Sequence, residues 1–418
     1  MQNMSYFCTV KYFRCFLTVI TTCLTLVAAE ASNIISNDTT RQAPDRDSIE
    51  ISLLTCAPGR EVYSLYGHTA IRVKDSNNGI DLAVNYGVFS FKKPYFILRF
   101  IFGLTDYEMG IMPFNEFCEE YKIAGREVFQ QVLNLTQEEK LAIAAAIQQN
   151  YLPENRTYRY NYFYDNCTTR ARDIITENIN GPIVYPDKHG EYPSFRELIH
   201  RFNDRYPWAR FGNDILLGVK ADAKTTRSEH EFLPLYLMKD FSNAQIIRAD
   251  GKAMPLATNQ SDVVLGSVDN GSEKFPLRPI SCAWIFFAVV LAMTTTELIK
   301  KKRLVAFDII LMFLDGCLGL LIFIMFFSQH PTTSTNLHIF ILNPIPLFFI
   351  WTVAKKQTNK TQKIFWIGAT ISILLFYLGG IFQDYAEGTY ILALSLLIRC
   401  LWNILLQEKI ISFKNVDK

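Results

Sequence analysis

The chain has 418 residues, half of them apolar, and a formal net charge of +2. This length and apolar content exceed what one soluble domain uses, and the near-neutral charge gives no reason to expect a nucleic-acid partner. Long uncharged runs are concentrated beyond Ile280, whereas residues 32–279 have the composition of a globular protein. The sequence therefore predicts a globular part followed by a membrane-embedded part.

The N-terminal segment, residues 1–31, has the layout of a secretory signal. Lys11 and Arg14 precede an apolar run from Phe16 to Ala29, and small residues surround its end. An uncleaved signal anchor is the alternative interpretation. Both interpretations send the residues that follow across the membrane.

Alternation of apolar and polar residues predicts strands in the exported part, and capping patterns predict helices. We expect one helix to begin after Thr136, which has Glu139 three residues on, and to reach Gln149. Further helices are expected from Cys167 and over Phe195–Phe202. The predicted strands are Ile51–Cys56, His68–Lys74, Leu82–Phe89, Glu127–Leu135 and Tyr158–Tyr164.

The segment Phe91–Phe117 is rich in aromatic and aliphatic residues and has Lys92, Lys93 and Arg99 near its start. It is too short and too interrupted to span a membrane. Aromatic and basic residues together suit the headgroup boundary, so one interpretation is an interfacial segment that admits lipid. The other is a core helix with solvated lysines.

Cys167 follows an aromatic run that ends in Asp165 and Asn166, two short polar residues suited to capping a helix. A cysteine in the first helical turn is placed for chemistry, because the helix amides and dipole stabilise a thiolate. A structural disulfide or an unreactive free thiol are the alternatives. The exported part also contains Cys56 and Cys118, and three cysteines cannot all pair. If a bridge exists, pairing of Cys56 with Cys118 leaves Cys167 as the reactive thiol.

A cysteine nucleophile needs a base, and the exported part offers four histidines. His68 follows Tyr66 and Gly67 and opens a predicted strand, whereas the others lie in polar or helical surroundings. We therefore expect His68 to be the base. The remaining candidates are His189, His200 and His230.

Beyond Ile280, five apolar runs are long enough to cross a bilayer as helices. Lysine and arginine follow the first, third and fifth runs, while the other two loops contain neither. This alternation places the basic loops in the cytoplasm and residues 32–279 outside it. The runs are Ser281–Leu298, Leu304–Phe327, Leu337–Ala354, Ile364–Phe382 and Tyr390–Leu406.

Three charged residues lie inside these runs. Asp308 and Asp315 share a helical face of the second run, and Arg399 lies in the fifth. An internal ion pair that fixes helix packing is one interpretation, and a polar seam that receives lipid headgroups is the other. The stretch Asn343-Pro344-Ile345-Pro346 is expected to break or kink the third run, which opens a groove or merely shapes the bundle.

Three motifs carry a family resemblance: Tyr66-Gly67-His68-Thr69-Ala70-Ile71-Arg72-Val73, then Asn85-Tyr86-Gly87-Val88-Phe89, then Tyr164-Asp165-Asn166-Cys167-Thr168-Thr169. They occur in the order of the circularly permuted NlpC-type papain-like hydrolases and acyltransferases. More closely, the chain resembles the bacterial lipoprotein N-acyltransferase family called Lnb, and the later pattern Asp214, Gly218, Asp222 and Phe232-Leu233-Pro234 adds support. The resemblance implies an α+β papain-like exported domain, residues 32–279, followed by an all-α transmembrane bundle of five helices, residues 280–418.

The resemblance also implies a reaction and a location. Cys167, activated by His68, would take an acyl chain from a membrane phospholipid as a thioester and pass it to the α-amino group of a diacylglyceryl-cysteine lipoprotein. Amides at the start of the Cys167 helix would form the oxyanion hole. Neither metal nor cofactor is implied. The enzyme would lie in the inner membrane with its catalytic domain in the periplasm.

The resemblance places a third catalytic residue on the strand after the histidine, where Asn85 is our choice; Tyr86 and Asp165 stay open. Asp165 is equally interpretable as part of the helix cap. Residues His330 and Asn336, in the exported loop between the second and third runs, would face the thiol domain. The candidate substrate-binding residues are Tyr66, Arg72, Tyr86, Asp165, His330 and Asn336.

Two other functions are compatible with these patterns. A membrane-anchored cysteine peptidase or amidase acting on cell-wall peptides would use the same scaffold, because fold does not decide function. The lipid-suited segment and five membrane runs favour a lipid substrate, since a wall peptidase needs only one anchor. A non-enzymatic receptor with Cys167 in a bridge is the third possibility, and labelling of the native thiol distinguishes it from both enzymes.

Overall fold

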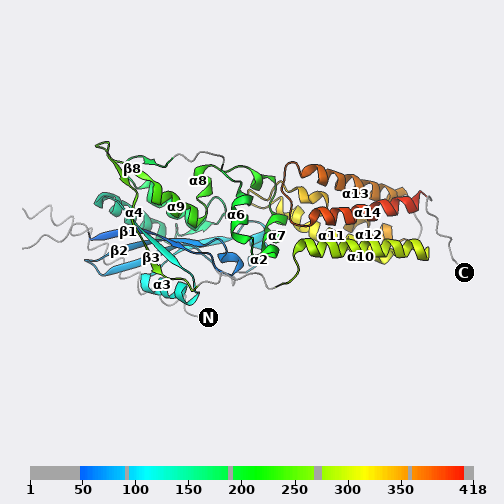
Figure 1. Ribbon diagram of the computed structural model, residues 1–418, viewed down its shortest axis with the longest axis horizontal. Helices are drawn as coiled ribbons and strands as arrows, with labels where there is room; N and C mark the ends of the chain where they lie inside the picture. Colours follow the sequence, from blue (N-terminus) through cyan, green and yellow to red (C-terminus); the bar gives the residue numbers. More distant parts are fainter. Residues whose placement is uncertain (1–47, 90–93, 187–191, 268–274, 356–359, 409–418) are drawn as a thin grey trace, which may run out of the picture. The chain divides into compact units, whose positions relative to one another are not determined.

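The structure is a computed structural model, and it describes residues 48–89, 94–186, 192–267, 275–355 and 360–408 (Figure 1). The predicted signal at residues 1–31 lies outside these ranges, as does His189. The chain forms two compact units. Unit 1 comprises Met1–Ser90, Asp106–Gly190 and Ser228–Asp269, and unit 2 comprises Phe91–Thr105, Glu191–Arg227 and Asn270–Lys418.

Unit 1 is built on an antiparallel sheet of seven strands in the order β10-β5-β1-β2-β3-β4-β6. In the centre, β1 pairs with β2 so that Cys56 lies opposite His68, and β2 pairs with β3 so that Ala70 lies opposite Asn85. The strands are β1 (Ile49–Cys56), β2 (His68–Asp75), β3 (Ile80–Val88), β4 (Asp106–Pro113), β5 (Val128–Leu133), β6 (Thr157–Arg159) and β10 (Ala257–Val264).

Helices cover both faces of this sheet (Figure 1). One face packs apolar side chains such as Leu53 and Ile71 against α4 (Gln137–Tyr151), α5 (Cys167–Glu177) and α9 (Pro234–Asn243). The opposite face packs Leu54 and Ala70 against Phe117 of α3 (Phe114–Ile123). Strand alternation divides the two cores, because neighbouring side chains of β1 and β2 point to opposite faces. Unit 1 also contains η2 (Val62–Ser64), α8 (Arg227–His230) and a small sheet of β7 (Ile183–Val184), β8 (Gln245–Ile247) and β9 (Ala253–Pro255).

Unit 2 contains five segments that are long and apolar enough, by length and composition, to cross a membrane. All five coincide with the predicted runs. The third is broken as expected: a short 3-10 turn and a helix of ten residues flank the Asn343-Pro344 stretch. The elements are α10 (Pro279–Lys300), α11 (Val305–Met325), η4 (Leu337–Phe340) with α12 (Ile345–Ala354), α13 (Lys360–Gly379) and α14 (Thr389–Gln407).

A buried ion-pair network crosses this bundle. Arg399 of α14 donates to Asp308 of α11, with Nη2 2.7 Å from Oδ1, and its Nη1 lies 3.2 Å from Oε2 of Glu297 in α10. Each of the three side chains is at most 2 % exposed. The internal pair predicted for Arg399 is therefore formed, and Glu297 is a partner that the sequence did not indicate.

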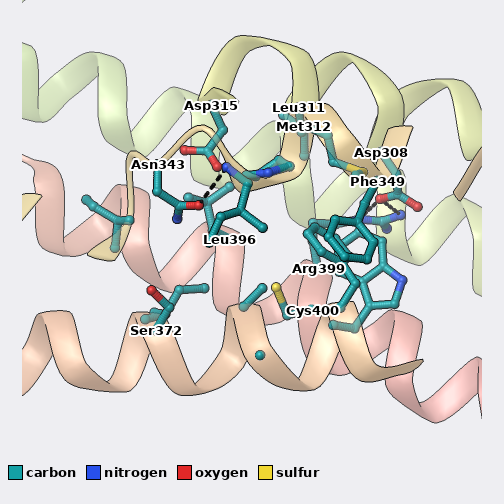
Figure 2. Close-up of a pocket in the computed structure, with 18 of the residues that line it drawn as sticks. Asp308, Leu311, Met312, Asp315, Asn343, Phe349, Ser372, Leu396, Arg399 and Cys400 are labelled. Atoms are coloured by element: carbon teal, nitrogen blue, oxygen red, sulfur yellow. Dashed lines mark hydrogen bonds and ion pairs between the residues drawn. The ribbon is translucent and has the colours of Figure 1, made fainter. Parts of the chain in front are cut away.

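Asp315 is not part of this network. It lines a cavity of about 280 Å³ between α11, α12, α13 and α14 (Figure 2). Asp308 of α11 and Arg399 of α14 also line this cavity. Asn343 and Ser372 supply further polar groups, and most of the lining is apolar. The break in the third segment contributes Asn343 and Pro346 to this cavity, so it shapes a hollow within the bundle.

Unit 2 also includes four elements from outside the membrane-spanning part of the sequence: α2 (Phe96–Ile101), α6 (Phe195–Asn203), α7 (Pro207–Leu216) and η3 (Val219–Asp222). Buried Arg196 of α6 ties three of them together, with Nη1 2.9 Å from Asp214 and Nε 2.7 Å from Asp222. A Cβ at Gly218 would lie 2.1 Å from the Thr335 carbonyl oxygen, so only glycine fits there. The motif residues Asp214, Gly218 and Asp222 therefore have packing roles.

Two predicted elements differ from the structure. The strand expected over Tyr158–Tyr164 ends at Arg159, because Asn161 and Asp165 exchange backbone hydrogen bonds that close a tight turn. The segment Phe91–Phe117 is not one interfacial element: after α2 it continues as β4 and the start of α3, both in unit 1. Alternation over Asp106–Pro113 was masked in the sequence by the surrounding apolar residues.

Candidate active site

The first turn of α5 presents Cys167. Asn166 is the N-cap, and its Oδ1 accepts from the amides of Thr168 and Thr169 at 2.8 and 3.0 Å. Its Nδ2 donates to the carbonyl oxygens of Tyr162 and Phe232. Because both ends of this buried amide are fixed, the start of the helix is held in one position. The cap therefore positions the cysteine.

His68 is the first residue of β2 and follows a glycine in the left-handed region. Gly67 has φ of +86°, and a Cβ there would lie 2.7 Å from the Cys56 carbonyl oxygen, so a larger residue cannot make this turn. Next to His68, Thr69 donates its hydroxyl to Thr168 Oγ1 at 3.1 Å, which joins β2 to α5. These contacts bring the histidine strand against the cysteine helix.

The Cys167 thiol and the His68 imidazole are close enough for each to shift the pKa of the other. Burial raises the pKa of the Cys167 thiol, but nearby His68 and hydrogen bonds from His68, the Thr69 amide and the Thr168 hydroxyl outweigh it and lower the pKa to about 7. Burial lowers the pKa of His68, and Cys167 together with Asn85 raises it above its ordinary value. Both directions favour a thiolate–imidazolium pair.

Asn85 of β3 lies on the other side of the imidazole. Its Oδ1 is 3.0 Å from Nε2 of His68. An amide oxygen accepts only, so this contact puts a proton on Nε2 and leaves Nδ1 as the nitrogen available to the thiol. The three residues thus form a chain from Cys167 through His68 to Asn85, in the arrangement that a nucleophile, a base and an orienting group require.

Gly87 lies beside Cys167, and its missing side chain defines the space next to that residue. Gly87 has φ of +88°, and a Cβ built on it would be 3.9 Å from the Cys167 Cβ, 3.8 Å from the Tyr158 hydroxyl and 3.6 Å from the Tyr160 ring. The lack of a side chain at Gly87 therefore leaves room at the nucleophile.

Tyr158 contributes a hydroxyl to this space. The side chain is 6 % exposed, and among the residues that the structure describes its hydroxyl has no hydrogen-bond partner. Burial raises its pKa, and the Cys167 thiolate raises it further, so the hydroxyl keeps its proton. The guanidinium of Arg170 lies 3.7 Å from the ring centroid and fixes the ring. A buried donor without a partner is costly unless something binds it.

The N-cap residue Asn166 limits which amides of the first helical turn can serve as oxyanion donors. The amides of Thr168 and Thr169 already donate hydrogen bonds to Asn166. The Cys167 amide is therefore the first-turn N–H that the cap does not bind. The Tyr158 hydroxyl is a second donor on the same side as Gly87. Sequence reasoning missed Tyr158 because it lies nine residues before the cysteine and the intervening turn was predicted as strand.

The other histidines are bound elsewhere. His230 is buried in unit 1 and its Nε2 lies 2.7 Å from Asp240 Oδ2. His200 belongs to unit 2, where its Nε2 lies 2.8 Å from Asp214 Oδ1. Within the described residues, His68 is the histidine that contacts Cys167.

Several predicted substrate-binding residues of unit 1 are occupied by internal contacts. Arg72 pairs with Asp81 at 2.7 Å and lies over the Phe114 ring, so its charge is already neutralised. Tyr66 packs edge-on against Tyr162. Tyr86 is buried in the core with its ring edge-on to Tyr158.

Asp165 does not cap α5. Its carboxylate forms a two-point ion pair with Arg170, at 2.6 and 2.8 Å, and so supports the guanidinium that covers Tyr158. Cys56 and Cys118 are free thiols, so the bridge that we preferred for them is not formed. Burial raises the pKa of Cys56 to about 12, which makes it unreactive beside the low-pKa thiol of Cys167.

His330 and Asn336 belong to unit 2. Asn336 is fully buried, donates to the Ile215 carbonyl oxygen and accepts from the His338 amide, so it has a structural role. The His330 Nε2 lies 3.1 Å from the Phe100 carbonyl oxygen. Among the described residues, no cluster of histidine, cysteine or carboxylate side chains is arranged to hold a metal ion.

The fold and sequence define a multi-pass membrane protein that carries an α+β sheet domain ahead of five apolar helices. Two family models match the chain: the Lnb N-terminal periplasmic domain over residues 37–200 and the Lnb transmembrane domain over residues 270–410. The protein therefore belongs to the Lnb family. No curated protein and no solved structure matches the chain.

Proposed function

We propose that the protein is a lipoprotein N-acyltransferase that moves an acyl chain from a membrane phospholipid to the α-amino group of a diacylglyceryl-cysteine. The observation that carries the proposal is the Cys167–His68–Asn85 chain, in which His68 lowers the pKa of the thiol and Asn85 orients the imidazole. Membership of the Lnb family supports a lipid substrate.

In the first half-reaction, the proton of Cys167 resides on His68 and the thiolate attacks the carbonyl carbon of the phospholipid ester. The new C–S bond forms a tetrahedral oxyanion, which accepts hydrogen bonds from the Cys167 amide and the Tyr158 hydroxyl. Collapse breaks the ester C–O bond, and the imidazolium protonates the leaving alkoxide. The products are a lysophospholipid and an acyl-thioester on Cys167.

In the second half-reaction, the α-amino group attacks the thioester carbonyl and His68 accepts a proton from the attacking amine. The C–S bond then breaks, which forms the amide and returns the thiolate. The same donors bind the second oxyanion. Dividing the transfer into two steps lets two substrates use one site in turn.

The Asn85 carbonyl oxygen keeps the imidazole in one orientation through both steps. With Nε2–H held by Asn85, Nδ1 is the ring nitrogen left to exchange a proton with the sulfur. Asn85 acts through His68 and is a positioning residue in this proposal.

Cells that carry Cys167→Ser or His68→Ala as their only copy of the protein test the function. Because each change removes a group that carries the proton or the acyl chain, mass spectrometry should find lipoprotein N-terminal peptides without the amide-linked chain. Arg72→Lys is the matched control, because Arg72 was also predicted to bind substrate but contacts only residues of its own unit. Intact N-acyl peptides in the Cys167→Ser cells would contradict the proposal, and cleavage of wall peptides by the purified protein would favour an amidase.

The proposed location is the inner membrane with unit 1 in the periplasm. The matched periplasmic and transmembrane family models and the distribution of basic loops support it. A protease added outside spheroplasts should cleave unit 1 while the basic loops stay protected.

A further inference from the structure

Helix α2 exposes large apolar side chains. Tyr95, at its N-cap, is 78 % exposed, and Leu98 and Phe100 are 54 % and 47 % exposed. A six-residue helix with such a surface has no stability of its own in water. The segment must therefore be held by contacts elsewhere, and its apolar side chains must face something other than the folded core.

Backbone contacts hold α2 to the loop between α11 and η4 in unit 2. The Gln329 amide donates to the Phe102 carbonyl oxygen at 2.9 Å, and His330 Nε2 donates to the Phe100 carbonyl oxygen at 3.1 Å. Burial lowers the pKa of His330, so the ring is a neutral donor. Both carbonyls belong to the C-terminal end of α2, where a helix leaves oxygens without intrahelical partners.

Glycine permits this close approach. Gly103 has φ of +67°, and a Cβ there would lie 3.0 Å from the His330 amide nitrogen and 3.1 Å from the Gln329 Cβ. The Phe100 ring also packs on the His330 ring, with centroids 5.8 Å apart. The contact between α2 and the loop is thus specific in backbone and side chain.

This loop marks one end of the membrane-spanning helices. It begins directly after α11, which ends at Met325, and it leads to η4, where the third apolar segment starts. The amides of Gly218 and Val219 donate to the carbonyl oxygens of Thr332 and Thr335 in this loop. The segment between α7 and η3 therefore also contacts the loop at the end of the spans. A helix fixed to residues 329–330 therefore lies where the apolar span meets the polar surroundings.

The bilayer-facing surface continues up to this point. Phe323 and Phe327, near the end of α11, are 44 % and 67 % exposed and pack edge to face with each other. Gln329 follows Phe327 by two residues. The apolar side chains of α2 thus add to the exposed apolar surface of a candidate membrane span.

We propose that α2 is an interfacial helix that contacts phospholipid in the outer part of the bilayer through Tyr95, Leu98 and Phe100. Its occupant is a lipid surface, because the helix is short, exposes aromatic and aliphatic side chains, and is fixed at the end of the spans. A protein partner would need a larger surface than three side chains supply. The contact stands apart from the acyl-transfer proposal, because it requires no chemistry at Cys167.

Three leucines of nearly equal exposure allow a matched test. Leu98 on α2 is 54 % exposed, Leu141 on α4 of unit 1 is 52 % exposed, and Leu318 in the span α11 is 52 % exposed. Each is replaced singly by benzoylphenylalanine in the full chain, reconstituted in nanodiscs of phosphatidylethanolamine and phosphatidylglycerol. Irradiation is followed by mass spectrometry of the labelled peptide.

We expect phospholipid adducts at positions 98 and 318 and none at 141. Adduct yield at position 98 that equals the yield at 141, or crosslinks from 98 to protein only, would overturn the proposal. Because Cys167 takes no part in the crosslink, the same measurement on a Cys167→Ala chain must give the same pattern. Failure of the acyl-transfer function would leave this result unchanged.

Discussion

Replacing His68 with alanine gives the most quantitative test of the proposed pair. In the wild-type protein, burial raises the pKa of Cys167, and the interactions with His68 are the leading causes that lower it to about 7. The variant keeps the burial and loses those interactions. We therefore expect the thiol pKa to return to 9.0 or above.

The expected change in reactivity follows from two opposing effects. At pH 7, a thiol with a pKa of about 7 is roughly half ionised, whereas one at its ordinary value is about 1 % ionised, a loss of about 50-fold. The more basic thiolate is intrinsically more nucleophilic, by about eightfold for this change in pKa. The net alkylation rate should fall by about sixfold at pH 7. Above the higher pKa the order should reverse, and the variant should react faster.

Alkylation by iodoacetamide measures this directly, with the Cys167 peptide followed by mass spectrometry between pH 5 and pH 10. The thiolate is lost as pH falls through the lowered pKa, so the wild-type rate should have its midpoint near pH 7. Cys56, whose pKa is raised to about 12, serves as an internal unreactive control. A His68→Ala variant that keeps a midpoint near pH 7 would refute the reasoning.

Four further changes test separate parts of the account. Tyr158→Phe should lower kcat for acyl transfer by about 100-fold without changing the alkylation rate of Cys167. A parallel loss of alkylation would show that the hydroxyl acts on the thiol. The control Tyr151→Phe alters a buried tyrosine of α4 and should leave both rates unchanged. Asn85→Ala should lower kcat by about 100-fold with little change in KM, because the imidazole loses its orientation; an unchanged kcat would remove Asn85 from the site. Arg399→Leu removes the cation that Glu297 and Asp308 share and should destabilise the membrane bundle by about 3–5 kcal/mol, seen as a lower Tm in detergent. Leu98→Gln should lower kcat/KM by about tenfold on phospholipid vesicles and leave turnover of a monomeric short-chain phospholipid unchanged. An equal decrease in kcat/KM on both acyl donors would argue against a lipid contact.

Local patterns predicted much of the fold. The five apolar segments were found because the bilayer demands about 20 apolar residues in a row, a signal that needs no tertiary information. The helix at Cys167 and the strand at His68 were found from capping residues and alternation. In both cases the residues that determine the element are neighbours in sequence.

Contacts between distant residues could not be predicted in this way. Glu297 pairs with Arg399 from another helix, and its position in the last turn of α10 reads as an ordinary helix end. Tyr158 lies near Cys167 because the chain turns between Asn161 and Asp165, where the aromatic residues have the pattern of a continuous strand. Backbone hydrogen bonds form the turn there, and the pattern of side chains does not predict those bonds.

The sequence did not show that α2, α6 and α7 belong to unit 2 with the membrane segments. Residues of α2 and of α6 and α7 lie far from the membrane segments along the chain, yet they pack with them in unit 2. The signal that could have found this is the glycine pattern. Gly103 and Gly218 each allow a backbone approach that no larger residue would permit.

The central claim is that Cys167 carries the acyl chain, and the mass of the intact protein tests it most directly. After exposure to phospholipid without a lipoprotein acceptor, the wild-type protein should gain the mass of one acyl chain, on Cys167, and hydroxylamine should remove it. Cys167→Ala should gain none. A wild-type protein whose mass does not change while it releases lysophospholipid, or an equal gain in Cys167→Ala, would contradict the account.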